Sequence, residues 1–371
     1  MEKAQLNKGQ SSACAIEESL RGGGIESNRR WVDADSRGGV DQRRRPDRGA
    51  LKLLVFFAFL GAAMLVADSA INFGMRHIKT SSFGVSNRIM AGRVGADIVI
   101  SGSSRALTHY DPRIIEAVTG LSAFNIGVNG SQTDMQLAVL QAYLRHNRKP
   151  RLLIHNLDLF SFTTSREIYN PAQYIPYLKE ESIYAGVRRV YPDAWKWHYL
   201  PLYGYAVEDM NLNWLLGVGA LMGIQPREDH FKGYLPRFRS WTDDFRRFRE
   251  SNPKGVVIPV EERGVEDFTR VIELCATRSI PVLAVYSPEY YEMQAIERNR
   301  AEILSKMKRI TDSFGVPIWD YSDSELSRER SRFYNSQHLN AEGATIFSTD
   351  LAHRLVSEGT SAFRISLDAK R

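Results

Sequence analysis

The chain has 371 residues, of which 43% are hydrophobic and 25% charged, and its net charge of +6 is modest; these values are typical of a globular protein. The length allows one large domain with additions or two smaller domains. Only two cysteines occur, Cys14 and Cys275, and this excludes both a disulfide-rich scaffold and a zinc site built on cysteines.

Residues 1–50 are rich in glycine, serine and charged side chains and contain few large apolar residues. Such a segment cannot bury enough apolar surface to offset its ordering entropy, so we expect a disordered tail. Its end and the first residues after it are strongly basic, through Arg43, Arg44, Arg45, Arg48 and Lys52. No nucleic-acid-binding motif accompanies these residues, so we interpret them as a topology signal and expect no nucleic-acid partner.

Residues 51–73 are predicted to form a transmembrane anchor. The apolar run at residues 53–67 has no charge, and its flanks extend it to the roughly 20 residues that cross a bilayer. A buried core helix and a cleaved signal peptide are the alternatives, although a signal peptide normally starts near residue 1. The basic residues before the run place residues 1–50 in the cytoplasm and residues 74–371 outside the cytoplasmic membrane, as in a periplasm.

Residues 74–371 show strands alternating with helices. Predicted strands cover 96–100, 123–128, 151–158, 280–286 and 316–320. Predicted helices begin at Asp111 and Thr133 and cover 265–276, 295–314 and 341–356. This alternation is typical of a parallel sheet with helices on both faces, so we expect an α/β fold with three α/β/α layers.

Residues 160–260 interrupt this alternation and are predicted to be a helical insertion rich in tyrosine and tryptophan. These aromatic residues either form the core of the insertion or build a lid or sugar-binding wall over the carboxyl edge of the sheet. The apolar residues 215–222 could touch the bilayer but are too few to span it.

Candidate site residues follow the predicted strands. Ser104 follows the first strand, Gly130 the second, and Asn156 and Asp158 end the third, whereas His338 precedes the last helix. A serine becomes a nucleophile when a base removes its proton and donors stabilise the oxyanion. Because the carboxyl ends of parallel strands meet at one edge, we predict a shared site with Ser104 as nucleophile and His338 as base.

Several of these residues have a purely structural interpretation. Ser104 could cap the helix that starts near Arg105, and His338 could be buried beside a helix cap at Asn340. Arg105 could hold an anionic substrate at the mouth of the pocket or form a surface salt bridge. His155 is expected to pack within the sheet. The eight histidines show no paired ligand spacing, so we expect neither a metal nor a cofactor.

Three segments together resemble the SGNH/GDSL hydrolase superfamily, in its membrane-anchored branch near the D-alanyl transfer and alginate O-acetylation proteins. Gly102-Ser103-Ser104 resembles the Gly-Asp-Ser block, and residues 125–130 resemble the second block, whose last glycine gives an oxyanion N–H. His338 lies in a segment similar to the last block. The resemblance implies a flavodoxin-like fold, with Ser104 as nucleophile and with Gly130 and Asn156 as oxyanion donors.

The chain departs from this pattern in two places. The family has aspartate three residues before its histidine, whereas this chain has Asn335. Asn335 is kept as a candidate catalytic residue, because asparagine can orient a histidine although it cannot stabilise an imidazolium by charge. Otherwise the site would be a Ser104–His338 dyad, use another carboxylate (Asp320, Asp323 or Asp158), or have lost hydrolysis. The third block also lacks Gly-Asn-Asp, which leaves the choice between Asn156 and Asp158 open.

The resemblance implies a serine esterase or acyltransferase that acts on acyl groups of cell-envelope polysaccharide or exopolysaccharide through an acyl-serine. Expected partners are the acylated polysaccharide or a small ester, the cytoplasmic membrane and a membrane-bound acyltransferase. Arg105 and Asp158 are candidate substrate-binding residues. The alternative is a catalytically inactive binding or scaffold component of a polysaccharide assembly system, which Asn335 favours.

Overall fold

A computed structural model describes residues 48–206, 212–227 and 230–363 of the chain, the last five of these by backbone only. Most of the predicted disordered tail lies outside the described residues. Its last three positions, 48–50, are instead the first turn of helix α1 (Arg48–Met75). The large compact unit of the chain is Leu54–Arg371.

Helix α1 contains the predicted anchor. At 28 residues it is about 42 Å long, which exceeds the ~30 Å hydrocarbon core of a bilayer. Among the described residues it is the one helix that is long and apolar enough to cross a membrane, and its apolar stretch is not buried within the protein. Its last two residues, Gly74 and Met75, are buried in the domain that follows.

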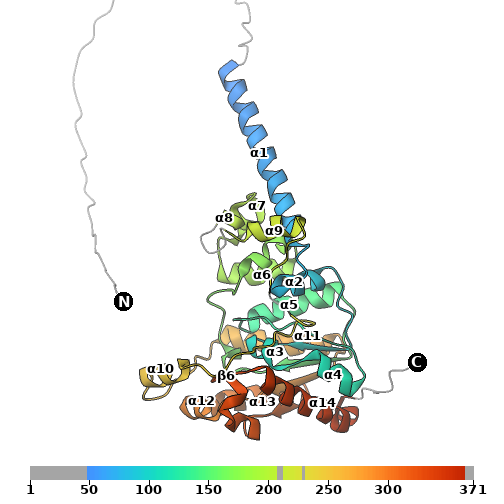
Figure 1. Cartoon of the computed structure of the whole chain (residues 1–371), viewed down its shortest axis with the longest axis vertical. Helices are drawn as coiled ribbons and strands as arrows, with labels where there is room; N and C mark the ends of the chain where they lie inside the picture. The colour runs from blue at the N-terminus through green and yellow to red at the C-terminus, as the bar shows by residue number, and fades with distance from the viewer. Residues whose placement is uncertain (1–47, 207–211, 228–229, 364–371) are drawn as a thin grey trace, which may run out of the picture. The chain divides into compact units, whose positions relative to one another are not determined.

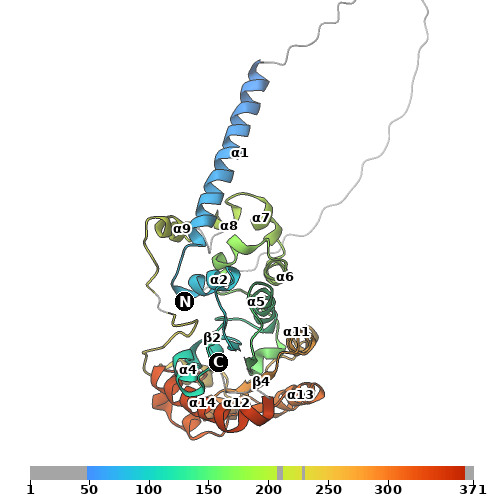
Figure 2. The same ribbon diagram turned by 90° about the vertical axis from the view of Figure 1, so that its right-hand side faces the viewer.

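The predicted α/β fold is confirmed: the core is a five-stranded parallel sheet (Figures 1 and 2). The strand order is β2-β1-β3-β4-β5. The strands are β1 (Ile98–Ser101), β2 (Ala123–Asn125), β3 (Leu152–Asn156), β4 (Val282–Tyr286) and β5 (Ile318–Asp320). The second strand ends three residues earlier than predicted, at Asn125, whose side chain donates to the carbonyl oxygens of Ala106 and Tyr110.

Alternate residues of the strands belong to two apolar cores, one on each face of the sheet. Val99 and Leu153 belong to one core, and Ile100 and Ile154 to the other. The first core includes residues of α2 (Ser81–Met90), α5 (Thr133–His146), α11 (Glu262–Thr277) and α13 (Arg300–Ser313). The second includes residues of α3 (Ser104–His109), α4 (Pro112–Thr119), α12 (Tyr291–Ile296) and α14 (Ala341–Phe363). The strands are buried on both sides, as expected for a parallel sheet.

The described part of the segment between β3 and α11 contains short helices joined by irregular stretches. It contains the short 3-10 helices η1 (Leu159–Phe162), η2 (Pro171–Gln173) and η3 (Ile175–Tyr177). They precede α6 (Glu181–Val190), α7 (Ala194–Tyr199), α8 (Tyr203–Ala206), α9 (Trp214–Leu221) and α10 (Asp244–Ser251). Its aromatic residues divide: Tyr174 and Tyr205 are buried in the core, whereas Trp195 and Tyr199 are exposed.

After β5, the chain forms the 3-10 helices η5 (Glu325–Arg328) and η6 (Arg330–Arg332). A small antiparallel hairpin follows, made of β6 (Phe333–Asn335) and β7 (His338–Leu339). Leu339 is fully buried in the second core, and α14 starts directly after the hairpin. The hairpin therefore holds the segment around His338 against the body of the domain.

Candidate functional site

Ser104 is positioned by a sharp turn between β1 and α3. Gly102 has φ +146°, and a Cβ atom there would lie 2.9 Å from the Cβ atoms of both Ala106 and Asn156, so only glycine fits. Ser103 caps α3, because its Oγ accepts from the Arg105 N–H at 3.2 Å. The interpretation of Ser104 as the cap is therefore wrong: Ser104 is the first residue of the helix, and its hydroxyl is left for another partner.

That partner is His338. The Nε2 atom of His338 lies 2.7 Å from the Oγ atom of Ser104, although the two residues are 234 positions apart in the chain. The imidazole ring stacks on Tyr334, with 5.3 Å between ring centroids and 20° between planes. Tyr334 belongs to the same hairpin, so the turn between β6 and β7 sets both rings, a contact that the sequence pattern did not indicate.

The other ring nitrogen of His338 faces Asn335. The Nδ1 atom lies 2.9 Å from the Asn335 Oδ1 atom. None of the three alternative carboxylates occupies this place: Asp320 and Asp323 are exposed, and Asp158 pairs with Arg105. The structure thus assembles a Ser–His–Asn triad rather than a dyad or a triad with a carboxylate.

His338 is held in its neutral form. Burial lowers the pKa of His338 to about 3, and the positive charges of Arg105 and Arg237 act in the same direction. At neutral pH, the ring is therefore free to accept a proton from Ser104. The same low pKa makes the imidazole a weak base, because no carboxylate stabilises its protonated form.

A cavity of about 140 Å³ opens beside Ser104 and His338. The cavity wall comes from the carboxyl edge of the sheet and from the hairpin, the place where ligands bind in open α/β folds. Gly130 lies on this wall, in the loop after β2, with φ +60°. The lining residues include Ser103, Arg105, Ser131, Gln132, Asp158, Leu159, Phe160, Glu289 and Gln337.

Asn156, the second predicted oxyanion donor, does not line this cavity. It is fully buried, and its Oδ1 atom accepts from the hydroxyl of Tyr110 at 2.7 Å. Its Nδ2 atom donates to the carbonyl oxygen of Leu157 at 3.1 Å and approaches Asp158 Oδ1 at 3.4 Å. Asn156 therefore lies behind the residues that line the cavity. Its position does not support the prediction that it is an oxyanion donor.

Arg105 was predicted to lie at the mouth of the pocket or in a surface salt bridge. It lines the cavity but is buried. The side chain is only 5% exposed, and its Nη1 atom lies 3.5 Å from the Asp158 Oδ1 atom. The guanidinium donates to the carbonyl oxygens of Ser287 and Pro288 and covers the ring of Tyr286. Burial raises the pKa of Asp158, and the charge of Arg105 opposes this rise. Both predicted substrate-binding residues thus form a buried ion pair in the cavity wall.

A second buried ion pair, which the sequence pattern did not reveal, lies next to the first. Glu289 lines the cavity, and its Oε2 atom accepts from the Tyr286 hydroxyl at 2.6 Å and from Arg300 at 3.1 Å. Burial and the charge of Glu289 raise the pKa of Glu297 to about 8. Glu289 closely follows β4, so the strand-end rule that identified Ser104 would also have identified Glu289 had it been applied to the fourth strand.

His109, the last residue of α3, contacts the β6–β7 hairpin that carries His338. Its Nε2 atom accepts from the backbone N–H of Leu339 at 3.0 Å, and its Nδ1 atom lies 2.9 Å from the Ser287 hydroxyl. Because a backbone N–H can only donate, Nε2 carries no proton and the ring is neutral. Burial, Arg105 and His338 lower the pKa of His109 well below its ordinary value. This fully buried histidine joins α3, β7 and the end of β4.

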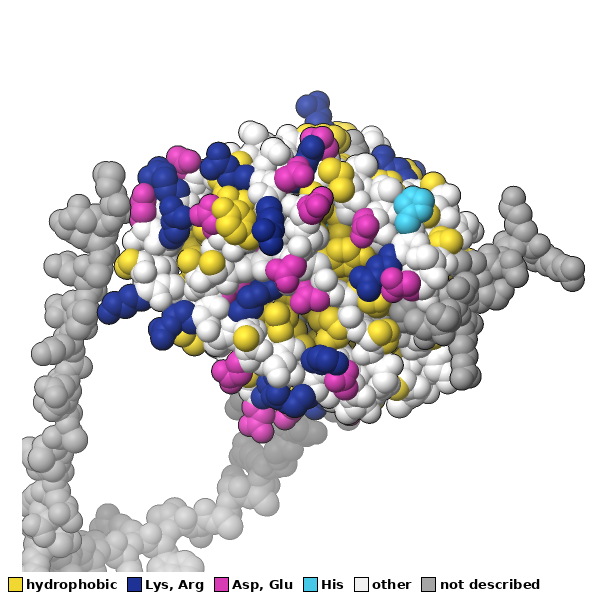
Figure 3. Space-filling view, turned by 90° about the horizontal axis from the view of Figure 1, so that it is seen from below, with side chains coloured by type: hydrophobic (Ala, Val, Ile, Leu, Met, Phe, Trp, Pro, Cys, Tyr) yellow, Lys and Arg dark blue, Asp and Glu magenta, His cyan; other side chains and the backbone are white. Residues whose placement is uncertain are grey.

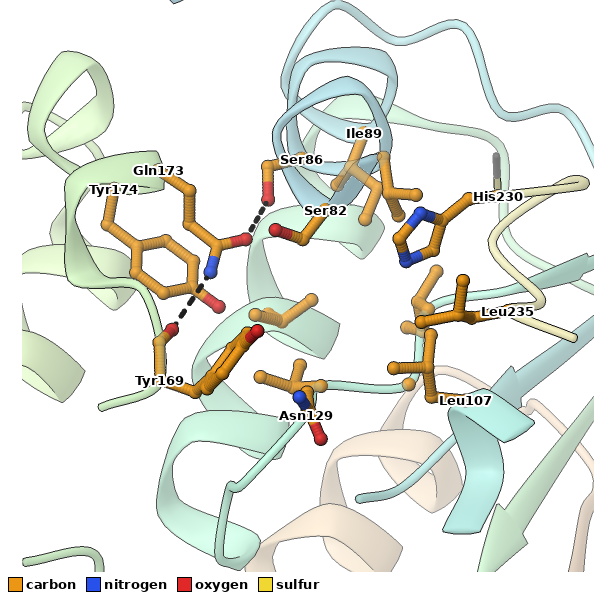
Figure 4. Close-up of a pocket in the computed structure, with 15 residues that line it drawn as sticks. Ser82, Ser86, Ile89, Leu107, Asn129, Tyr169, Gln173, Tyr174, His230 and Leu235 are labelled. Carbon is orange, nitrogen blue, oxygen red and sulfur yellow. Dashed lines mark hydrogen bonds between the residues drawn. The ribbon is translucent and has the colours of Figure 1, made fainter. Parts of the chain in front are cut away.

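A smaller cavity, of about 30 Å³, is lined by residues 126–129 of the loop that brings Gly130 to the first cavity (Figure 4). Gln173 spans one side of it: its Oε1 atom accepts from Ser86 at 3.1 Å, and its Nε2 atom donates to the Tyr169 carbonyl at 3.1 Å. A volume of this size holds only one or two waters or a small apolar group.

Comparison of the chain with protein-family models and with curated protein sequences finds no match.

Proposed function

We propose that this protein is a serine esterase or acyltransferase of the SGNH/GDSL type that forms an acyl-serine on Ser104. One observation carries the proposal: Ser104, His338 and Asn335 are connected by contacts of 2.7 Å and 2.9 Å beside a cavity at the carboxyl edge of the sheet. A nucleophile within hydrogen-bond reach of a base, with that base oriented by a third group, is the arrangement that acyl transfer requires.

The proposed reaction has two stages. The Ser104 Oγ atom attacks the ester carbonyl carbon while His338 Nε2 takes the hydroxyl proton. The tetrahedral intermediate then collapses, the C–O bond to the alcohol breaks, and the alcohol leaves with that proton. In the second stage a water or a sugar hydroxyl gives its proton to His338 and attacks the acyl carbonyl carbon. The bond from this carbon to the Ser104 Oγ atom then breaks, His338 gives the proton to Oγ, and the carboxylic acid or the acylated sugar leaves. The backbone N–H groups of Ser104 and Gly130 are the proposed oxyanion donors.

The resemblance to the family supports this proposal. The strand order 2-1-3-4-5 is that of flavodoxin-like doubly wound sheets, which bind ligands at the carboxyl edge of the sheet. The three segments that resemble family blocks include Ser104, Gly130 and His338, and all three of these residues line one cavity. The triad differs from the family pattern in Asn335 alone.

The proposed location is the cytoplasmic membrane, with α1 as a single-pass anchor and the α/β domain on the extracytoplasmic side. The length and composition of α1 and the basic residues before it support this topology. The proposed substrates are acylated cell-envelope polysaccharides, exopolysaccharides or small esters. A membrane-bound acyltransferase is the partner proposed to supply or receive the acyl group.

A second function, a non-catalytic binding or scaffold component, is favoured by one specific observation. The group that orients His338 is a neutral amide, and the pKa of His338 is low, so the triad lacks the charge that stabilises an imidazolium.

A fluorophosphonate probe separates the two functions, because it reacts with an activated serine hydroxyl. We expect the full-length protein in mild detergent to be labelled, and Ser104→Ala and His338→Gln to lose the label. Ser305→Ala, which removes an exposed hydroxyl from α13, serves as the control and should be labelled like the wild type. Absence of label on the wild type would favour the scaffold, and a label that persists in Ser104→Ala would refute Ser104 as the nucleophile.

Release of acetate from acetyl esters, with and without a sugar acceptor, then distinguishes hydrolysis from transfer.

A further inference from the structure

The helical segment near the end of α1 has an unusual surface. We call residues 194–206 and 212–224, which contain α7, α8 and α9, the collar. Residues 212–224 contain no charged side chain. Large apolar side chains of the collar are exposed by between 38% and 68%, among them Tyr199, Leu212, Trp214, Leu215, Met222 and Ile224. A cluster of this kind on a soluble domain marks a surface that contacts a partner or a membrane.

The collar packs directly on the last turns of α1 (Figures 1 and 2). A Cβ atom on Gly217 would lie 2.7 Å from the carbonyl oxygen of Ile71, and a Cβ atom on Gly74 would collide with the backbone of Gly217. The two helices thus touch backbone to backbone through facing glycines, a mode of contact common between helices in membranes.

Polar contacts reinforce this packing. The Asp68 Oδ1 atom accepts from the backbone N–H of Leu202 at 2.9 Å, and its Oδ2 atom accepts from the Asn72 side chain at 2.8 Å. The Tyr205 hydroxyl donates to Asn72 Oδ1 at 2.8 Å. The collar therefore satisfies two polar side chains of α1, those of Asp68 and Asn72.

These contacts fix the position of the collar along the axis of α1. Residues 53–72 of α1 span about 30 Å, the thickness of the hydrocarbon core. Asp68 and Asn72 thus lie near the boundary where α1 leaves the core, and the collar is attached at this level. Its exposed residues include tryptophan and tyrosine, which are enriched at membrane interfaces. The ammonium group of Lys196 lies 5.8 Å from the ring centroid of Trp195, a pairing of cation and aromatic ring that also suits this region.

The opposite end of the domain has a different surface. Figure 3 views it from below and shows positive and negative side chains interspersed with apolar ones. Exposed ion pairs occur there, such as Arg247–Asp244 on α10 and Lys308–Asp312 on α13. A surface of this kind is suited to water, so the apolar collar is not a general property of this domain.

We propose that the collar is a second membrane contact, which rests in the boundary between lipid headgroups and acyl chains on the side where α1 leaves the membrane. The proposal rests on membrane insertion of α1. The partner is the lipid surface itself, because the collar continues the apolar surface of the spanning helix. The short connection between α1 and α2 is bound to the residues that directly follow the collar. Thr80 Oγ1 donates to the Pro226 carbonyl oxygen and the Lys79 N–H donates to Gln225 Oε1, both at 2.7 Å. The domain is thus held at two places and faces the membrane in a defined orientation.

Single cysteines carrying an environment-sensitive fluorophore test this proposal. The background is full-length protein with Cys14→Ser, in which the remaining Cys275 is buried. Labels are placed at Met222→Cys in the collar, at Phe59→Cys in α1 and, as a control, at Phe238→Cys, whose parent side chain is 86% exposed and lies outside the collar. The proteins are reconstituted into phosphatidylcholine vesicles with and without lipids that carry a shallow nitroxide quencher.

We expect blue-shifted emission and quenching at positions 59 and 222, and neither at position 238. Quenching at 59 without quenching at 222 would overturn the collar proposal and leave the anchor intact. Absence of quenching at both 59 and 222 would overturn the anchor itself. Equal quenching at 222 and 238 would show a general approach of the domain to lipid and would also refute a specific role of the collar.

Discussion

Asn335 presents its side-chain oxygen to the Nδ1 atom of His338, and the backbone prevents the amide from turning round. The same Oδ1 atom accepts from the backbone N–H groups of His338 and Gln337, at 2.9 Å and 3.1 Å. Rotation of the amide would place its NH₂ group against these two donors. His338 consequently carries its proton on Nδ1 and leaves Nε2 free for Ser104. Asn335 thus reproduces the orienting role of an aspartate and lacks only its charge.

Asn335→Asp should raise the rate of the reaction. A carboxylate at this position would keep all three hydrogen bonds and stabilise the imidazolium that forms in the transition state. A gain of one to two pKa units for His338 would raise kcat/KM by at most roughly 10- to 100-fold, because the rate of general-base catalysis follows base strength only in part. The measurement is hydrolysis of an acetyl ester by the full-length protein. Asn335→Leu is the matched control and should lose activity, because it removes the acceptor. A fall in the rate of Asn335→Asp, with an unchanged circular dichroism spectrum, would contradict this account of the triad.

The pH profile should show an unusually low acid limb. Only neutral His338 can accept the Ser104 proton, and its pKa is lowered to about 3, so activity should fall only well below the ordinary histidine value of about 6.5. The rate of fluorophosphonate labelling, followed over the pH range in which the protein stays folded, measures this limb. In Asn335→Asp the limb should move to higher pH. An acid limb near 6.5 in the wild type would show that His338 is not held neutral.

His155 should make the fold sensitive to acid. This buried residue of β3 has no hydrogen-bond partner for either ring nitrogen within the described structure, and burial lowers its pKa to about 4. The unfolded chain therefore binds a proton below about pH 6.5 that the folded chain does not, so stability falls as the pH falls from 6.5 towards 4. The loss below the lower pKa amounts to about 3 kcal/mol.

His155→Met should remove this part of the pH dependence and raise the free energy of unfolding at pH 7 by about 1–2 kcal/mol, because an unsatisfied polar ring is replaced by an apolar side chain. Denaturant unfolding at pH 7 and pH 5 in mild detergent measures both effects. Leu153→Met, a buried position on the same strand, is the control and should keep the wild-type pH dependence. An unchanged pH dependence in His155→Met would remove His155 as its cause.

Arg105→Met should destabilise the protein strongly. It leaves the buried Asp158 without its counter-ion, beside the equally buried Glu289, and breaking a buried pair in this way costs about 3–5 kcal/mol. Arg113→Met is the matched control: this arginine also pairs with a buried aspartate, Asp111, but its side chain is 52% exposed and the loss should be about 1 kcal/mol.

The double variant Arg105→Met/Asp158→Leu should recover much of the loss, because it removes both charges. Denaturant unfolding of the three variants measures the differences in the free energy of unfolding. If Arg105→Met cost no more than Arg113→Met, the pair would contribute little to the stability of the cavity wall.

Local patterns were sufficient for the framework of the protein. The charge-free run within residues 51–73 predicted α1, and the alternation of strands and helices predicted the parallel sheet, because apolar periodicity and connection length largely specify such elements. The rule that residues following parallel strands meet at one edge predicted that Ser104, Gly130 and Asp158 share a site, and all three line the cavity, whereas Asn156, predicted by the same rule, does not. These conclusions needed only the spacing of residues along the chain.

The tertiary structure decided which side chains face the cavity and which partners they have. Asn335 rather than Asp158, Asp320 or Asp323 orients His338, since the β6–β7 hairpin brings its oxygen to Nδ1. Arg105 turns inward to Asp158, and Asn156 turns away to Tyr110. The sequence by itself determined the elements and the edge at which the site lies. Side-chain direction and burial depend on contacts between segments that lie far apart in the chain, such as Tyr110 with Asn156 and Ser104 with His338, and only the folded chain sets these contacts.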